Sequence, residues 1–448
     1  MSADRVSAAA ATPPGMVATA NPGLLRTIRA LRSRNYRLFF SGQGVSLIGT
    51  WMQSVALGWL VYRLTGSSKA LGAVAFAGQI PMLLLSPIAG VLADRWDLRR
   101  TLVATQSLMA LQAALLAVLT LSAVITQWQI IALSVMAGML NALDMPARQA
   151  FVVQMVERPE DLSNAIALNS FLFNGARLVG PSLAGLVVAA LGEGPCFLLN
   201  AVSFAAVILA LLAMRVAPRA RPRRDATLLH GLAEGFAYVL RFRPILTVLG
   251  LLSLVSLTGM SYATVMPVFA KEILGGGPRT YGFLLGATGV GAVLGVLYLA
   301  ARPSVLGLGR IIALGAAAFG IGLIALARVH ELWLALPLLL FMGLGMMLQI
   351  ASSNTIIQTI VDEDKRGRVM SIYGMSFIGM APFGSLLIGN LADALGVPLT
   401  LMLGGGCCIL GALAFASQLP AMRRLVRPIY VRKGILSEGP GAADGHAA

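Results

Sequence analysis

Residues 215–243 read RVAPRARPRRDATLLHGLAEGFAYVLRFR and carry seven of the 34 Lys and Arg residues in the chain. Six long apolar runs precede this basic segment, and six more follow it. Each run has about 20 residues with few charges, which is the length that spans a bilayer as a helix. Inside lipid the backbone must satisfy its own hydrogen bonds, and a helix does so within one segment. The pattern therefore predicts an all-α membrane protein with twelve transmembrane helices in two pseudo-symmetric six-helix halves.

The composition is typical of a chain that is embedded in a lipid bilayer. Hydrophobic residues make up 57% of the 448 residues and charged residues only 12%, whereas a soluble domain carries roughly 25% charged residues. The spans are expected near 38–60, 70–92, 101–124, 128–146, 164–190, 196–214, 245–270, 281–301, 310–327, 332–353, 368–393 and 398–419. The three cysteines have no disulfide or metal spacing, so we expect them to be small packing residues.

The net charge of +16 is a topology signal rather than a sign of nucleic-acid binding. If the N-terminus is cytoplasmic, the cytoplasmic segments hold 28 of the 34 Lys and Arg residues, and the external loops hold five. Cytoplasmic loops carry the excess of these residues, so both termini are expected in the cytoplasm. The expected organisation is a flexible tail (1–34), a first half (35–214), a linker with an amphipathic helix (215–243), a second half (244–420) and a second tail (421–448).

An internal repeat supports the division into halves. Glycines of the fifth predicted helix recur 204 residues later, in the eleventh, as do one glutamine and one phenylalanine. The recurring pairs are Gly175 and Gly379, Gly180 and Gly384, Gly185 and Gly389, Gly192 and Gly396, Gln154 and Gln358, and Phe173 and Phe377. Coincidence in a glycine-rich chain is the alternative. Parallel repeats of this kind place the substrate path at their interface, near the middle of the membrane.

Three stretches resemble the major facilitator superfamily of secondary transporters. The loop after the second predicted helix reads GVLADRWDLRR (90–100), which is similar to the signature Gly-x-Leu-Ala-Asp-Arg-x-Gly-Arg-Lys of that superfamily. Asp97 replaces the second glycine, and Leu98 replaces the following Arg. The segments GTWMQSVALGWLVYRLTG (49–66) and MPARQAFVVQMVERPEDLSNAIALNSFLFNGARLVGPSLAG (145–185) resemble the branch that contains bacterial enterobactin exporters and drug–proton antiporters.

The resemblance implies a conformational latch on the cytoplasmic side. In the superfamily, the aspartate of this loop docks on the start of helix 11 when the cytoplasmic side is closed; here that start lies near Arg368 and Val369. A carboxylate is stabilised there by the helix dipole. Arg95 or Arg99 would pair with Asp144, expected at the cytoplasmic end of helix 4. The latch set is Gly90, Asp94, Arg95, Arg99, Asp144 and Arg148. The alternative is that the arginines of the loop only fix the topology.

Arg177 needs an explanation of its own, because it lies deep in the fifth predicted helix. An arginine at such a depth costs at least roughly 2.5–3.5 kcal/mol and marks a functional site by default. The alternative is a structural arginine that binds backbone carbonyls. Gly180, Pro181 and Gly185 resemble part of the helix 5 antiporter motif, and this resemblance implies efflux. The cationic residue of the helix 4 antiporter motif is absent before Gly138, which puts the usual route of proton coupling in question.

By analogy with the superfamily, helices 1, 4, 7 and 10 should line the substrate cavity. Their polar, aromatic and methionine side chains give an adaptable surface for varied apolar ligands, and ordinary packing is the alternative for each. The cavity set is Gln43, Trp51, Gln53, Asn141, Met260, Tyr262, Met266, Met346 and Gln349. Helices 1, 7 and 10 have no acidic residue within the bilayer core, which favours an apolar or amphipathic substrate.

These observations predict a monomeric transporter of the bacterial inner membrane that exports a small amphipathic molecule, such as a drug or a siderophore, by proton antiport. An importer or facilitator of a polar metabolite is the alternative, and a membrane-embedded enzyme or scaffold is a distant one. The sequence has no convergent acid–base cluster, metal-ligand spacing or nucleotide-binding loop. We therefore expect a non-enzyme with no cofactor, no metal and no nucleic-acid partner, whose partners are its substrate, protons and the lipid bilayer.

Overall fold

The computed structural model describes residues 28–215, 228–302 and 304–436, except for the side chains of residues 87, 90–95 and 228–233. Within these residues, twelve helical segments are long and apolar enough to cross a membrane. The predicted fold class and the number of spans are therefore confirmed. The helices extend a few residues beyond the predicted apolar runs at most ends.

The first half has six helices, which are joined by short turns. Its helices are α2 (Arg34–Thr65), α3 (Ser68–Arg95), α4 (Leu98–Leu121), α5 (Gln127–Met155), α6 (Leu162–Leu191) and α7 (Glu193–Ala213). Local signals set several of the ends. Gly66 ends α2 in the left-handed conformation, and the Asp97 carboxylate caps α4 by accepting the backbone N–H groups of Arg99 and Arg100.

The second half follows α8 (Leu228–Arg241), the helix expected in the linker. Its first span is irregular and contains a 3₁₀ turn and a π turn, and its fifth span is broken in two. The elements are α9 (Arg243–Thr258), η3 (Met260–Val265), α10 (Met266–Val268), η4 (Phe269–Ile273), α11 (Pro278–Ala300), α12 (Leu308–Leu326), α13 (Leu332–Ile360), α14 (Arg366–Phe377), α15 (Ala381–Leu395) and α16 (Val397–Arg432).

Two helices run nine or more residues further than the sequence predicted. The fourth span was expected to end at residue 146, but α5 includes Pro146 and continues to Met155. A proline removes one helical hydrogen bond, and the burial of Phe151 and Met155 against neighbouring helices stabilises the extra turns. The last span was expected to end at residue 419, but α16 includes Pro420 and Pro428 and reaches Arg432. The ends of helices that contain proline were therefore the least accurate part of the prediction.

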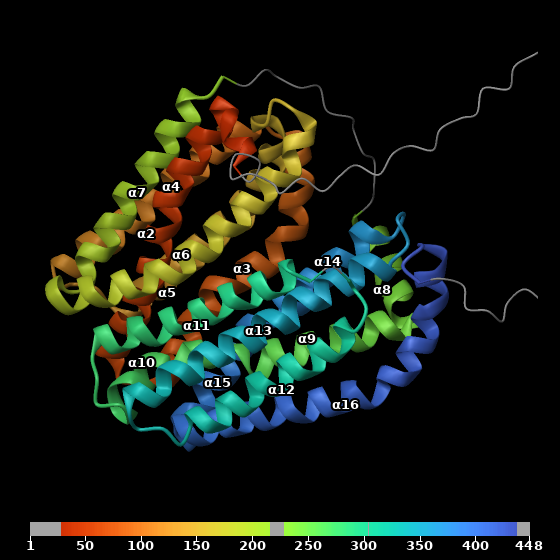
Figure 1. The fold of residues 1–448 in the computed structure, drawn as a ribbon. Coiled ribbons are helices and arrows are strands. Elements are labelled where there is room, and N and C mark those ends of the chain that lie inside the picture. The colour runs from red at the N-terminus through yellow and green to blue at the C-terminus, as the bar shows by residue number, and fades with distance from the viewer. Residues whose placement is uncertain (1–27, 216–227, 303, 437–448) are drawn as a thin grey trace, which may run out of the picture.

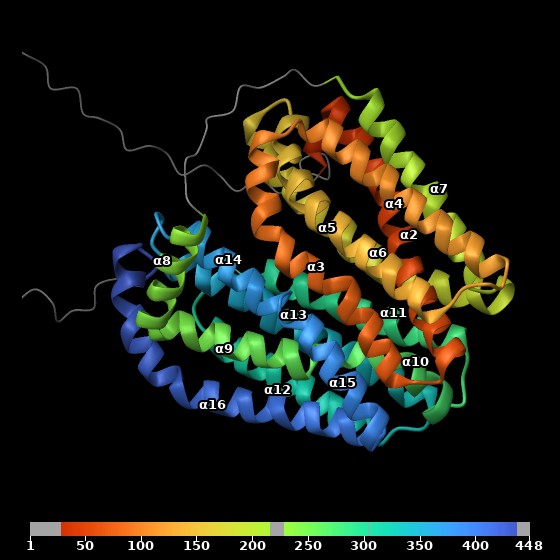
Figure 2. The same cartoon turned by 180° about the vertical axis from the view of Figure 1, so that it is seen from behind.

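The two ends of the bundle differ. We call the end where α2 begins, α7 ends, α8 lies and α16 ends the linker face, and the other end the opposite face. In Figures 1 and 2 the halves meet near α10, α11 and the end of α15 that lies at the opposite face, and their ends diverge at the linker face. The most extensive contacts between the halves are those of α6 with α11 and of α3 with α15.

Glycines allow these pairs to pack closely. A Cβ at Gly282 of α11 would lie 2.8 Å from the Cα of Gly185 on α6, and a Cβ at Gly389 of α15 would lie 2.8 Å from the Cα of Gly72 on α3. Backbone-to-backbone packing of small residues is a common way for membrane helices to associate. The interface between the halves therefore depends on residues without side chains at these four positions.

The glycine repeat has a structural counterpart. Gly185 and its counterpart Gly389 each meet a glycine of the other half. Gly192 and Gly396 each end a helix with a positive φ, of 85° and 83° respectively, a conformation that favours glycine. Equivalent positions of the two halves therefore have equivalent roles, which is the relation expected of two repeats.

Candidate functional site

The interior of the interface between the halves is occupied by an arginine. Arg177 lies midway along α6, and its guanidinium carbon is 5.9 Å from the centre of the Trp51 ring of α2. Its Nη2 lies 3.9 Å from the sulfur of Met346 on α13. Phe173, one turn before Arg177, packs edge-on against Trp51 with ring centres 5.9 Å apart. We call Trp51, Phe173, Arg177 and Met346 the Arg177 site.

Three of these four residues were predicted, and Phe173 was missed as a site residue. Phe173, Arg177 and Gly180 lie on one face of α6, where the absence of a side chain at Gly180 lets Trp51 pack against the helix. The spacing of four between Phe173 and Arg177 was the available signal, since residues four apart share a helix face. Pro181 and Gly185, one turn further along, pack against Gly282 of α11 and so belong to the interface between the halves.

Other residues of the predicted cavity are engaged elsewhere. Gln53 binds Gln112 and Asn200 through its amide, with distances of 3.1 and 2.8 Å, so it lies inside the first half. Gln43 and Gln349 are also buried, with 3% and no exposure respectively. Gln349 packs against Gly315 of the second half. Among the described residues, the Oε1 of Gln43 and the amide of Gln349 have no hydrogen-bond partner.

The rest of the cavity set belongs to the seventh span and to α5. Met266 is fully buried, Met260 is half-buried, and Tyr262 forms a 3.1 Å hydrogen bond with Thr288 of α11. Asn141 of α5 is exposed, and its amide donates to the carbonyl of Ala137 on its own helix. Among these four residues, Asn141 is the one that the structure leaves accessible.

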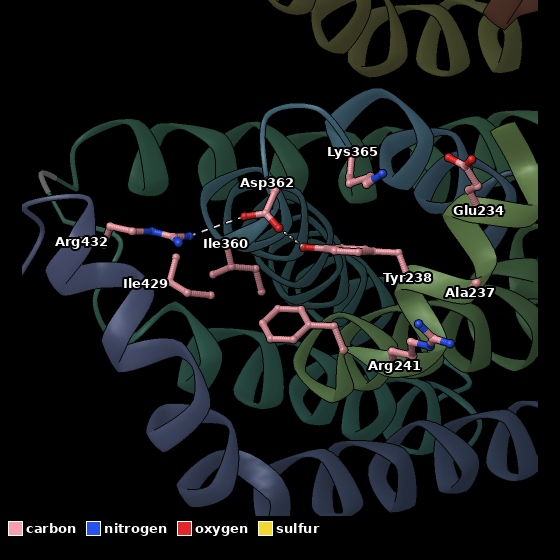
Figure 3. Close-up of a pocket in the computed structure, with 10 residues that line it drawn as sticks. Glu234, Ala237, Tyr238, Arg241, Ile360, Asp362, Lys365, Ile429 and Arg432 are labelled. Atoms are coloured by element: carbon pink, nitrogen blue, oxygen red, sulfur yellow. Dashed lines mark hydrogen bonds and ion pairs between the residues drawn. The ribbon is translucent and has the colours of Figure 1, made fainter. Parts of the chain in front are cut away.

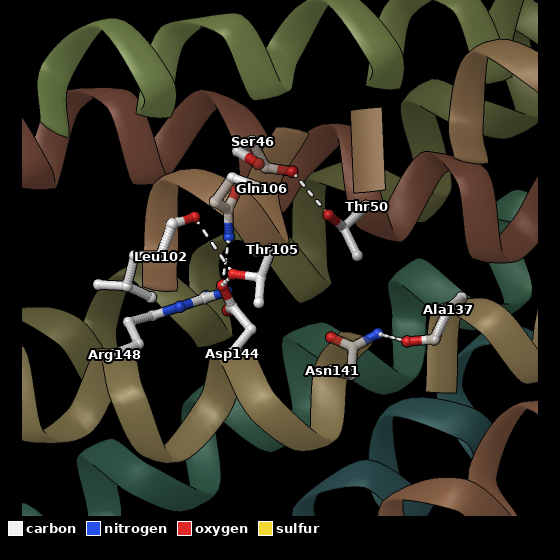
Figure 4. A network of polar contacts seen from close by, with 9 residues as sticks. All are labelled: Ser46, Thr50, Leu102, Thr105, Gln106, Ala137, Asn141, Asp144 and Arg148. Carbon is white, nitrogen blue, oxygen red and sulfur yellow. Dashed lines mark hydrogen bonds and ion pairs between the residues drawn. The ribbon is translucent and has the colours of Figure 1, made fainter. Parts of the chain in front are cut away.

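Asp144 was expected at a helix end but lies inside the first half, because α5 continues beyond Pro146. It is fully buried, and Figure 4 shows it between α4 and α5. Its Oδ1 accepts hydrogen bonds from Thr105 and Gln106, both at 2.8 Å, and its Oδ2 forms an ion pair with Arg148. The carboxylate is therefore satisfied from two sides by α4 and by its own helix.

The expected pairing of Arg99 with Asp144 is not present in this conformation. Arg99 instead donates to the carbonyls of Leu211 and Leu212, at 2.8 and 2.7 Å, and so caps the end of α7. Carbonyls at a helix end lack helical partners and attract cations. The side chains of the latch residues Gly90, Asp94 and Arg95 lie outside the described residues.

The opposite face is closed by contacts between the halves. A tyrosine and a serine of the first half donate to acidic residues of the second, and two aromatic rings stack nearby. These contacts are Tyr62 to Glu272 at 2.9 Å, Ser67 to Asp393 at 2.9 Å, and Trp59 with Tyr281 at 6.3 Å between ring centres. We call these six residues the opposite-face gate. No sequence pattern marked them, because the partners lie more than 200 positions apart.

At the linker face, α8 is held against the second half. Arg368 near the start of α14 forms an ion pair with Glu234 of α8. Asp362 accepts a 3.1 Å hydrogen bond from the Tyr238 hydroxyl and lies 3.5 Å from Arg432 of α16 (Figure 3). Burial raises the pKa of Tyr238, so the hydroxyl stays protonated and remains a donor. The pocket drawn in Figure 3 lies between α8, α13 and α16.

Comparisons with known proteins agree with this geometry. A family model described as transmembrane secretion effector matches residues 26–427. The chain is 29% identical to a staphyloferrin A transporter of Staphylococcus aureus, covering 82% of this chain and 92% of the relative. It is also 29% identical to the multidrug efflux pump Tap of Mycolicibacterium fortuitum, covering 84% and 93% respectively.

Solved structures show the same fold at low sequence identity. A crystal structure of the nucleoside transporter NupG superposes with a TM-score of 0.69 at 13% identity, over 86% of this chain and 99% of that chain. A bacterial homologue of the lysosomal transporter Spinster, solved in an inward-facing conformation, superposes with a TM-score of 0.66 at 14% identity, over 90% and 98%.

Proposed function

Since the chain belongs to the transmembrane secretion effector family of the major facilitator superfamily, we propose that it exports small amphipathic molecules from the bacterial cytoplasm by proton-driven alternating access. The relatives support export: one is named a siderophore transporter, and another a multidrug efflux pump. The observation that carries the proposal is the Arg177 site, in which a cation midway along α6 and aromatic rings lie between the two halves.

In this proposal the linker face is cytoplasmic. The segments at this face hold the excess of Lys and Arg residues that cytoplasmic loops carry. The opposite-face gate then closes the external side, and the substrate reaches the Arg177 site from the linker face, where the ends of the halves diverge. This is the conformation in which an exporter loads its substrate. The two halves of one chain supply both walls of the path, so a monomer suffices.

The return to the outward-open state needs the linker face to close. We assign this closure to the latch, in which Asp94 docks at the start of α14. Arg368 lies at that start and is paired with Glu234 of α8 in the present conformation. On closure, the carboxylate of Asp94 would therefore replace that of Glu234 beside Arg368. Glu234 of α8 binds Arg368 in the cytoplasm-open state, and Asp94 would bind beside it in the closed state. The two states therefore compete for one cationic residue.

Proton coupling is assigned to Asp144, to a bound water or to the substrate itself. Arg177 cannot carry the proton, because an arginine does not lose its proton in proteins. Asp144 is a buried carboxylate in the first half, and protonation would release Arg148 from its ion pair. The usual cation of helix 4 is missing from the sequence, which favours a different arrangement of the coupling groups in this chain.

Inverted membrane vesicles test the proposal. When respiration acidifies their interior, an exporter accumulates a fluorescent amphipathic substrate, and a protonophore abolishes the accumulation. An importer would instead empty preloaded vesicles under the same gradient. Proton coupling would be refuted if the protonophore did not change the accumulation. Export would be refuted if, for every substrate of a panel, vesicles with and without the protein accumulated the same amount.

A further inference from the structure

Arg177 has contacts but no acidic partner among the residues that the structure describes. Among the described residues it contacts the Trp51 ring and the Met346 sulfur, and Tyr262 lies close enough to interact with it electrostatically. An aromatic face attracts a cation weakly, and a thioether is a weak acceptor. A guanidinium has five N–H donors, so most of its hydrogen-bonding capacity is unused by the described part of the protein.

Two other arginines of the first half form ion pairs with carboxylates of the protein. Arg63 binds the Glu193 carboxylate with both Nε and Nη2, at 2.8 and 3.2 Å. Arg148 forms an ion pair with Asp144. Among the ion pairs of the described residues, by contrast, none includes Arg177.

The donors of Arg177 are also not sealed inside the protein. The buried side-chain nitrogens and oxygens without a hydrogen-bond partner do not include any atom of Arg177. The Arg177 side chain is half-buried, so part of it remains accessible. The walls beside them are aromatic, since Trp51 is half-buried and Phe173 is 48% exposed. The Arg177 site thus combines one open cation with an aromatic surface.

We propose that the Arg177 site selects amphipathic anions, in which a carboxylate or a similar planar oxyanion is attached to an aromatic or apolar body. This inference rests on the proposed export function and specifies its substrate class. The guanidinium binds the oxyanion through two parallel N–H bonds, and Trp51 and Phe173 pack against the body. A cationic substrate has no carboxylate to meet here and is repelled by Arg177.

The same chemistry couples substrate binding to the conformational change. When the linker face closes, the Arg177 site is removed from water. An unpaired guanidinium is far more costly to bury than one whose charge is matched by an anion. A bound anion therefore lowers the barrier to closure, and the empty site keeps the protein open on the linker face. An exporter needs this order of events to avoid turning over without substrate.

Three probes that share one aromatic body and differ in charge test the inference. They are 1-pyrenebutyrate, 1-pyrenebutanol and 1-pyrenebutylamine. Binding is measured by energy transfer from tryptophan to pyrene in the full chain in nanodiscs, with empty nanodiscs as the background. The wild type should bind the butyrate at least about tenfold more tightly than the alcohol, and the amine most weakly.

Two variants assign the preference to the arginine. Arg177→Gln should remove the preference for the butyrate and leave the affinity for the alcohol within about twofold, while Arg177→Lys should keep part of the preference. Arg328→Gln makes the same charge change at an exposed position and should bind all three probes like the wild type. Equal affinities of the wild type for the three probes, or no binding of the butyrate, would overturn the inference. If Arg177→Gln lowered the affinity for all three probes equally, Arg177 would be a packing residue.

Transport separates this inference from the proposed function. If inverted vesicles accumulate the alcohol as fast as the butyrate, the protein is an exporter but does not select anions. If they accumulate no probe and no other amphipathic compound, export itself is refuted. Accumulation of the butyrate alone, with loss in Arg177→Gln, supports both.

Discussion

The close approach of α6 and α11 makes one glycine a sensitive test of the proposed conformational cycle. We expect Gly185→Ala to shift the protein toward the state that is open at the opposite face. A Cβ at Gly185 would lie 2.8 Å from the carbonyl oxygen of Pro278 and 3.0 Å from the Cα of Gly282, where ordinary contacts are 3.4–4 Å. Both neighbours are backbone atoms, so the two helices must separate by about half an ångström to relieve the overlap.

The size of the effect follows from the overlap. Overpacking of a close interface costs typically about 1–3 kcal/mol, and this cost falls on the state in which α6 and α11 touch near the opposite face. A coupling of that size changes a conformational equilibrium by about 5–150-fold. Gly175 of the same helix is the matched control, because a Cβ there meets nothing within 4 Å. Gly175→Ala gains the same helix propensity without the overlap.

Double electron–electron resonance measures the shift. Spin labels are attached to cysteines at Val124 and His330, exposed positions in turns of the two halves at the opposite face. The three native cysteines are first replaced by alanine. Gly185→Ala should populate a longer distance than the parent, and Gly175→Ala should not. Gly282→Ala, whose Cβ would meet the Cα of Gly185 at 2.8 Å, should act in the same direction. Identical distance distributions in all variants would show that this contact does not distinguish the two states.

Three further changes test the charged groups. Asp144→Asn leaves Arg148 without its partner, so thermal denaturation should show a loss of stability of up to about 3–5 kcal/mol. A proton-flux assay should also show that transport is uncoupled from the pH gradient. Flux equal to that of the wild type would exclude this carboxylate as the proton carrier. Glu234→Gln releases the start of α14 and should favour closure of the linker face in distance measurements, whereas Glu363→Gln removes only an exposed ion pair and should have no effect. Asp94→Asn should leave the protein folded but slow transport, and an unchanged rate at normal expression would mean that the loop only anchors topology.

The spans could be predicted because each depends on its own residues. Apolar runs of about 20 residues identify a membrane helix without any knowledge of its neighbours. The glycine repeat could also be read directly, since Gly185 and Gly389 occupy equivalent positions. The end of α5 could not, because continuation through Pro146 depends on buried contacts of Phe151 and Met155 with other helices. A rule that uses only the neighbouring sequence does not include those tertiary contacts.

The cavity set was less predictable than the spans. A polar residue in a membrane helix can face a shared cavity or a polar neighbour inside its own half, and the sequence does not distinguish the two. Gln53 is the clear example, because its partners Gln112 and Asn200 come from two other helices of the same half. Trp51 and Met346 were predicted on the same grounds, but they do meet Arg177.

Asp144 and Arg177 show where sequence reasoning ends. Arg148 follows Asp144 by four positions, a spacing at which opposite charges pair on a helix, so their ion pair could have been predicted. The positions three and four residues from Arg177 are Phe173, Asn174, Gly180 and Pro181, and none is acidic. The partner of Arg177 therefore had to come from another helix or from outside the protein. In the described part of the chain no other helix provides it, which is why we propose that the substrate supplies the negative charge.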